Sequence, residues 1–166
     1  MAIFFITFVA FIIGFILIAL LKKTSPPRPQ ETLRFDNAAG IPAFLAEREK
    51  FKAKCLAFLE KFNLEYRHSI WADDDELEVD LRDETPVVGG KYLALCLFEP
   101  MDNLVGLHKV TGFLETVKGE GASRGIVITT GYFSEEAIRA AEGEPVELVN
   151  VVSFVNYLKK FEIYDG

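Results

Sequence analysis

Residues 91–98 restrict the folds open to this chain more than any other stretch. They read Lys-Tyr-Leu-Ala-Leu-Cys-Leu-Phe, so nearly every side chain is apolar. A strand with apolar side chains on both of its faces fits the middle of a sheet that is covered on both sides. Residues 125–130 have the same character. The pattern therefore predicts an α/β fold with buried strands packed between helices.

Amphipathic segments surround these two runs. Residues 43–62 place apolar side chains at a spacing near 3.6, which predicts a long helix, and residues 76–81 alternate as a half-buried strand does. An acidic turn at residues 73–75 and a Gly-Gly turn at residues 89–90 separate the strands. We expect the order helix, three strands, helix, strand, helix, strand, helix, over residues 43–62, 64–71, 76–81, 91–98, 104–118, 125–130, 134–142, 146–149 and 151–161.

The chain carries no charged side chain between residues 2 and 21. About twenty apolar residues match the roughly 30 Å hydrocarbon core of a bilayer. A cleaved signal peptide is the less favoured alternative, because a basic start and an Ala-x-Ala site are both missing. Basic residues follow the run directly, which favours a cytoplasmic location for what comes after it. We expect a single-pass transmembrane helix (1–22) in the inner, cytoplasmic membrane, a proline-rich juxtamembrane linker (23–40) and a folded cytoplasmic domain (41–166).

The charge balance disfavours a general affinity for nucleic acid. The 18 Lys and Arg residues are outnumbered by 25 Asp and Glu, which gives a net charge of -7. Because all these charges lie after residue 21, the part outside the membrane would repel DNA as a whole. Contact with phosphates would need a local basic patch, for which the candidates are Arg82, Lys91, Lys109 and Arg124.

The cysteines and histidines suggest no chemistry of their own. Cys55 and Cys96 both lie in apolar runs, which is typical of buried thiols in a reducing compartment, with a disulfide as the less favoured alternative. His68 and His108 are forty residues apart, and no exposed Ser or Cys elbow accompanies them. We therefore expect neither a metal site nor a nucleophilic triad from these residues.

The most specific pattern in the chain spans residues 120–149. Residues 120–137 read Glu-Gly-Ala-Ser-Arg-Gly-Ile-Val-Ile-Thr-Thr-Gly-Tyr-Phe-Ser-Glu-Glu-Ala, and Ala-Ala (140–141) and Pro-Val-Glu-Leu-Val (145–149) follow. This combination resembles the second half of the Mrr-type restriction endonuclease domain. The resemblance extends from about residue 44 to residue 161 and is weakest before residue 79. It implies a restriction-endonuclease-like α/β fold, in which helices flank a central mixed sheet, with DNA cleavage as the activity of the family.

The resemblance also indicates where the chemistry of that family would take place. An Asp at the end of one strand and an acid or amide on the next hold Mg²⁺, and a lysine two positions later helps to generate the attacking hydroxide. Asp80 matches the Asp, whereas Leu95 and Leu97 stand at the other two positions. Both leucines share one face of their strand, and neither can hold a cation or donate a proton. The resemblance thus implies a remnant metal ligand at Asp80 and a lost reaction.

Other charged residues are weaker candidates to replace the missing groups. Lys91 has the parity of Leu97 but lies about 20 Å from it along a strand. Glu47 and Glu49 could approach the site from the first helix, although a helix also needs solvated charges. The acidic run at residues 73–76 lacks the Asp-x-Asp-x-Asp-Gly spacing of a calcium loop, so we expect a solvated turn.

Two functions are compatible with this sequence. The favoured one is a membrane-anchored bacterial protein whose nuclease-fold domain is inactive, needs no cofactor, and binds or organises a protein partner or DNA. The alternative is an active Mg²⁺-dependent DNA endonuclease of the Mrr type that uses Asp80 and a partner elsewhere in the chain. An Asp80 with no carboxylate or lysine within about 6 Å would mark an inactive site. The sequence leaves the oligomeric state open.

Overall fold

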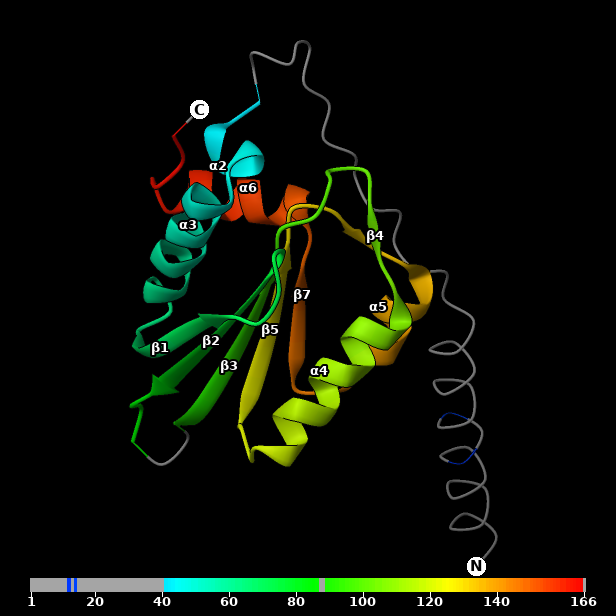
Figure 1. The fold of residues 1–166 in the computed structure, drawn as a ribbon. Coiled ribbons are helices and arrows are strands. Elements are labelled where there is room, and N and C mark those ends of the chain that lie inside the picture. The colour runs from blue at the N-terminus through cyan, green and yellow to red at the C-terminus, as the bar shows by residue number, and fades with distance from the viewer. Residues whose placement is uncertain (1–11, 13, 15–40, 87–88, 166) are drawn as a thin grey trace, which may run out of the picture.

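The computed structural model describes residues 12, 14, 41–86 and 89–165 (Figure 1). The predicted transmembrane helix and linker fall outside these residues, apart from Ile12 and Gly14. Among the helices of the described part, none has the length and apolar character needed to cross a bilayer. The fold described below is that of the predicted domain.

A mixed sheet forms the centre of the described residues. Its first three strands are antiparallel neighbours, and the remaining two continue from the third in parallel. This confirms the mixed sheet that the sequence predicts. In spatial order the strands are β1 (Leu64–Trp71), β2 (Glu76–Asp83), β3 (Gly90–Leu97), β5 (Arg124–Thr129) and β7 (Val146–Val149).

Helices cover both faces of this sheet, as Figure 1 shows. The alternation of β3 explains why: Ala94 and Cys96 join the core on one face, and Leu93, Leu95 and Leu97 join the core on the other. A strand that is apolar throughout is thus stabilised by two separate cores. One face carries α2 (Ala43–Ala46), α3 (Arg48–Glu60) and α6 (Val151–Lys160), and the other carries α4 (Leu107–Gly119) and α5 (Glu135–Ala141).

The predicted helix over residues 43–62 is wrong in its continuity. It is two helices, because Glu47 adopts an extended conformation (φ -128°, ψ 119°) between them. The break lets Phe44 pack edge-on against Phe154 and Tyr164, each with a 6.0 Å distance between ring centroids. Both partners lie near the end of the chain, so local periodicity could not reveal the break.

The predicted helix over residues 104–118 starts too early. Leu104 and Val105 form the short strand β4 (Leu104–Val105), which pairs in parallel with β6 (Tyr132–Phe133), a strand that the sequence analysis missed. The Tyr132 amide donates to the Asn103 carbonyl at 2.9 Å. Two residues are too short for a periodic signal, and the pairing joins segments almost thirty residues apart.

The other predicted elements are confirmed within one or two residues. Ser134 caps α5, because its Oγ accepts a hydrogen bond from the Ala137 amide at 3.2 Å. The end of β5 is fastened by the buried Thr130, whose hydroxyl donates to the Glu99 carbonyl at 2.6 Å and accepts from the Glu99 amide at 2.7 Å. These bonds hold the ends of β3 and β5 together.

The prediction of buried thiols is also confirmed. Cys55 on α3 and Cys96 on β3 are free and fully buried. Burial raises the pKa of the Cys55 thiol well above its usual value, and its hydrogen bond with Cys96 raises it further. Both thiols belong to the core between α3 and the sheet, on the opposite face from Asp80.

Candidate functional site

A cleft of about 270 Å³ lies where the outer part of the sheet extends beyond α4. In Figure 1, α4 lies on the β5 side of the sheet, away from β1. The face of β2 next to this helix is therefore left open, and its alternating acids Glu76, Glu78 and Asp80 point into the cleft. The apolar lining includes Leu93, Leu95 and Phe113, and the remaining charged or titratable lining is His68, His108, Lys109 and Glu120.

Asp80 is held by a lysine from the neighbouring strand. Its carboxylate lies 3.3 Å from the Lys91 Nζ, and the His68 Nδ1 is 4.0 Å away. Lys91 also donates to Glu120, the residue that follows α4. These partners raise the pKa of Lys91, with the Glu120 hydrogen bond as the largest cause. Asp80 does have a lysine within 6 Å, although it stands before Leu93 on β3, not at the family position.

The two positions that the resemblance assigns to catalytic groups belong to the core. Leu95 is 4 % exposed and Leu97 only 1 % exposed. Both pack in the cluster that includes Val110 and Phe113 of α4. The helix thus presses an apolar surface onto the part of β3 where the family carries an amide or acid and a lysine.

A second ion pair closes the other end of the cleft. The Lys109 Nζ, on the first turn of α4, donates to the Glu76 Oε2 at 2.7 Å, and this bond raises the pKa of Lys109. Glu76 is the direct β-sheet partner of Leu97. An ammonium group therefore stands near the Leu97 end of the cleft, but it comes from a helix.

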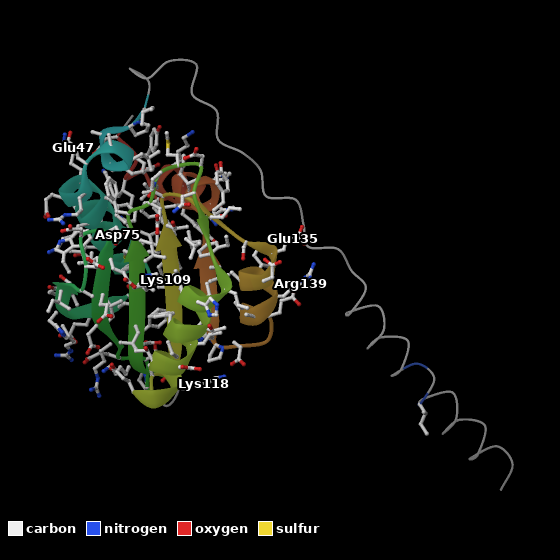
Figure 2. All side chains as sticks on the ribbon, turned by 45° about the vertical axis from the view of Figure 1, so that its right-hand side comes forward. Glu47, Asp75, Lys109, Lys118, Glu135 and Arg139 are labelled. Carbon is white, nitrogen blue, oxygen red and sulfur yellow. The ribbon has the colours of Figure 1, made fainter. Side chains whose placement is uncertain are left out.

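The residues proposed for phosphate contacts come together only in part, because Arg82 and Lys91 are direct partners across β2 and β3 whereas Lys109 lies apart from them. Lys91 and Lys109 are paired with acids at opposite ends of α4, a helix of 13 residues and thus about 20 Å long. Figure 2 shows Lys109 and Lys118 near the two ends of this helix. The Arg82 Nε lies 3.8 Å from a Glu84 carboxylate oxygen, and Arg124 is exposed at the start of β5. Phosphate binding by these residues stays a prediction.

The residues around Asp80 do not fit a bound Mg²⁺. Such an ion takes oxygen ligands, yet Leu95 and Leu97 offer none and the Asp80 carboxylate already holds an ammonium group. Within the described ranges, three possible ligand side chains come within 4.8 Å of one another only at Asp73, Asp75 and Glu76 on the acidic turn. The structure thus offers no set of three carboxylate or imidazole ligands around Asp80.

The helix acids that were weighed as substitutes are elsewhere. Glu47 pairs with Lys50 at 2.7 Å, and Glu49 lies 3.7 Å from the Arg48 guanidinium. Both belong to the α3 side of the sheet, whereas Asp80 faces α4. Figure 2 places Glu47 at the outer edge of the molecule, remote from Lys109.

Sequence reasoning missed the two ion pairs that shape the cleft. The common parity of Glu76, Glu78 and Asp80 was available as a signal that three acids share one face of β2. No sequence signal could show that Lys109 and Glu120 come close to the acids and the lysine of the sheet, because this depends on how α4 crosses the sheet. His68, for which the sequence analysis predicted neither a metal site nor a nucleophilic triad, lines the cleft beside Asp80.

Comparisons with known proteins identify a family and several similar solved structures. Residues 47–158 match the family model Mrr_cat, described as a restriction endonuclease. Solved structures that resemble the chain include the DNA modification-dependent restriction endonuclease AspBHI (18% identity, 81% of this chain and 40% of that chain, TM-score 0.49). They also include the MspJI restriction endonuclease in complex with a 27-mer oligonucleotide (13% identity, 82% of this chain and 35% of that chain, TM-score 0.46). A third is a protein of unknown function (18% identity, 64% of this chain and 64% of that chain, TM-score 0.47). The chain spans less than two thirds of the length of each, and no curated protein matches it.

Proposed function

Because this chain belongs to the Mrr_cat restriction endonuclease family, we propose that it keeps the nuclease fold without the hydrolytic reaction and serves as a binding or scaffold module. One observation carries this proposal. Leu95 and Leu97 are buried beneath α4, and the acid that is left, Asp80, is neutralised by Lys91.

Phosphodiester hydrolysis of the family type needs a cation that activates water and a group that stabilises the developing charge. The leucines supply neither, because their side chains carry no polar atom and pack in the core under α4. A single carboxylate in an ion pair is a poor ligand for a strongly hydrated divalent cation. The side chains of this region therefore favour a folded scaffold over a catalyst.

We place this module at the cytoplasmic side of the bacterial inner membrane, anchored by residues 2–21. The support is the uncharged length of that segment and the basic residues that follow it. Protease treatment of inverted membrane vesicles should digest the domain, and treatment of intact spheroplasts should leave it whole. Protection in the inverted vesicles would contradict this orientation.

The cleft favours a protein partner over nucleic acid. Four carboxylates line it, those of Glu76, Glu78, Asp80 and Glu120, and the two lysines that pair with them, Lys91 and Lys109, leave an excess of negative charge. A phosphate backbone would meet like charge there. We expect the full chain to show no mobility shift of a 30-base-pair duplex even at low salt. Binding at low salt that falls steeply as salt is added would instead support a role in DNA binding.

One observation favours the second candidate, an active Mg²⁺-dependent endonuclease. Lys109 brings an ammonium group to the Leu97 end of the cleft, on the same side of the sheet as Asp80. A lysine that has moved from β3 to α4 could stabilise charge at that end. In this proposal the metal ligand would be Asp80, with Glu78 on the same face of β2.

A plasmid-cleavage assay with Mg²⁺ or Mn²⁺ separates the two candidates. The full chain is compared with the variants Asp80→Asn and Lys109→Met. Lys118→Met is the matched control, because Lys118 is also a lysine of α4 that forms an ion pair with a glutamate (Glu144, 2.8 Å). We expect no metal-dependent cutting by any of the four proteins. Cutting by the wild type that both Asp80→Asn and Lys109→Met abolish, and that Lys118→Met retains, would establish the endonuclease.

A further inference from the structure

We infer that the Lys91 ammonium replaces the divalent cation at Asp80, so that this site is neutralised from within the chain and does not respond to metal. The inference deepens the proposed function and rests on the same Asp80 site. It assigns a role to a lysine that stands at none of the family positions.

Two carboxylates from separate elements converge on this one ammonium group. Asp80 comes from β2 and lies 3.3 Å from the Lys91 Nζ, and Glu120 follows α4 and accepts a hydrogen bond from the same nitrogen. Both acids line the same cleft. An ammonium group has three hydrogens to donate and attracts carboxylate oxygens, which are the ligands that Mg²⁺ and Mn²⁺ prefer. Lysine and metal would therefore compete for the same oxygens.

The backbone puts these three side chains together. Lys91 pairs with Arg82 across the antiparallel ladder and Asp80 with Leu93, so Lys91 and Asp80 share a face as diagonal neighbours. The chain leaves α4 through Gly121, which has a positive φ of 63°.

A backbone bond then fixes the end of α4 beside β3. The Ser123 amide donates to the Lys91 carbonyl at 2.8 Å. Glu120 is thus held next to the first residues of β3 by the main chain, whatever its own side chain does.

Removal of the ammonium group would leave a pair of carboxylates that can share a cation. The two charges, facing one another across the cleft without Lys91, would repel and destabilise the fold. A divalent cation would relieve this repulsion and hold the same two elements together. The site should therefore be latent, and a single substitution should make the protein sensitive to metal.

Thermal unfolding of the full chain in detergent micelles, with and without millimolar Mn²⁺, tests this inference. We expect no shift of the wild-type midpoint that depends on Asp80. In Lys91→Met, Mn²⁺ should raise the midpoint by about 2–5 °C, as expected for a ligand well above its Kd. Asp80→Asn in the Lys91→Met background should abolish this rise, and Lys91→Arg, which keeps the positive charge, should behave as the wild type does.

Each outcome supports or overturns the inference. If Mn²⁺ raises the unfolding midpoint of the wild type and Asp80→Asn removes this rise, metal and lysine coexist at the site and the inference is overturned. If Mn²⁺ does not change the midpoint of Lys91→Met, the carboxylates do not form a cation site and the inference is overturned as well. If Lys91→Met is unfolded without metal, refolding on addition of Mn²⁺ supports the inference and failure to refold counts against it. Asp80-dependent Mn²⁺ binding by the wild type without cleavage would refute this inference alone, whereas cleavage that does not depend on Asp80 would refute only the proposed function.

Discussion

Replacement of Leu97 by lysine would restore the residue that the resemblance assigns to this position, and we expect it to destabilise the domain by roughly 3–6 kcal/mol. Leu97 is 1 % exposed and packs beneath α4. If position 97 belongs to the hydrophobic core, a lysine there disrupts the packing and buries a charge. If the position is still a catalytic one, the lysine should be accommodated.

The magnitude follows from two losses and one partial gain. Removal of the buried leucine side chain forfeits about 2 kcal/mol of apolar burial. A lysine kept in that environment would be forced toward its neutral form, and a pKa depressed by about 3 units costs roughly 4 kcal/mol at neutral pH. Partial relief could come from Glu76, the β-sheet partner of Leu97, but that carboxylate already holds Lys109.

Urea unfolding of the full chain in detergent micelles measures the effect. The fluorescence of Trp71, the single tryptophan of the sequence, reports on the domain because it lies at the end of β1 with the Arg48 guanidinium 4.6 Å from its ring. We expect the midpoint for Leu97→Lys to fall by about 2 M. Leu97→Met, which nearly conserves the volume, should lose less than about 1.5 kcal/mol. A Leu97→Lys protein within about 1 kcal/mol of the wild type would refute the assignment of this position to the core.

Three further predictions concern the stability of the same domain. Gly125→Ala should lower the free energy of unfolding by about 1–3 kcal/mol, because its Cβ would come within 2.8 Å of Phe113. Gly112→Ala, in open space on α4, should instead raise the free energy of unfolding by about 0.5–1 kcal/mol. Thermal unfolding compares the two variants, and a more stable Gly125→Ala than Gly112→Ala would contradict this prediction. Burial raises the pKa of the Tyr92 phenol to about 12, so above pH 10 the unfolded state loses this proton first. The free energy of unfolding of the wild type should therefore fall by up to about 2 kcal/mol between about pH 10 and pH 12. Urea titrations should show a smaller fall in Tyr92→Phe, and equal falls in the two proteins would disprove this cause. Thr130→Val removes the hydroxyl that ties β5 to the end of β3 and should cost about 1–3 kcal/mol by urea unfolding, whereas a neutral result would mean that water satisfies the freed backbone groups.

Local patterns were sufficient for most elements of the fold. Burial of strands on one or both faces and the apolar spacing of helices are set by nearby residues, and they predicted every strand of the central sheet. The failures share one cause. The break at Glu47 and the β4–β6 pair depend on Tyr164 and on residues 132–133, which are distant in sequence and close only after folding.

The candidate site divides in the same way. The sequence by itself determined which groups are present: the acids of β2, two leucines where the family has polar residues, and an uncharged segment at the start of the chain. Side-chain parity also determined that Lys91 and Leu97 share a face of β3. It could not say which partner Lys91 meets, because strand register and the path of α4 are tertiary properties.

Only the tertiary structure decided the state of Asp80. The antiparallel register brings Lys91 diagonally to it, and the exit of the chain from α4 brings Glu120 to the same ammonium group. Charge neutralisation acts over a few ångströms, whereas these three residues span forty positions of the sequence. The sequence therefore determined that leucines stand where the resemblance implies polar catalytic residues, and the fold determined which ammonium group pairs with Asp80.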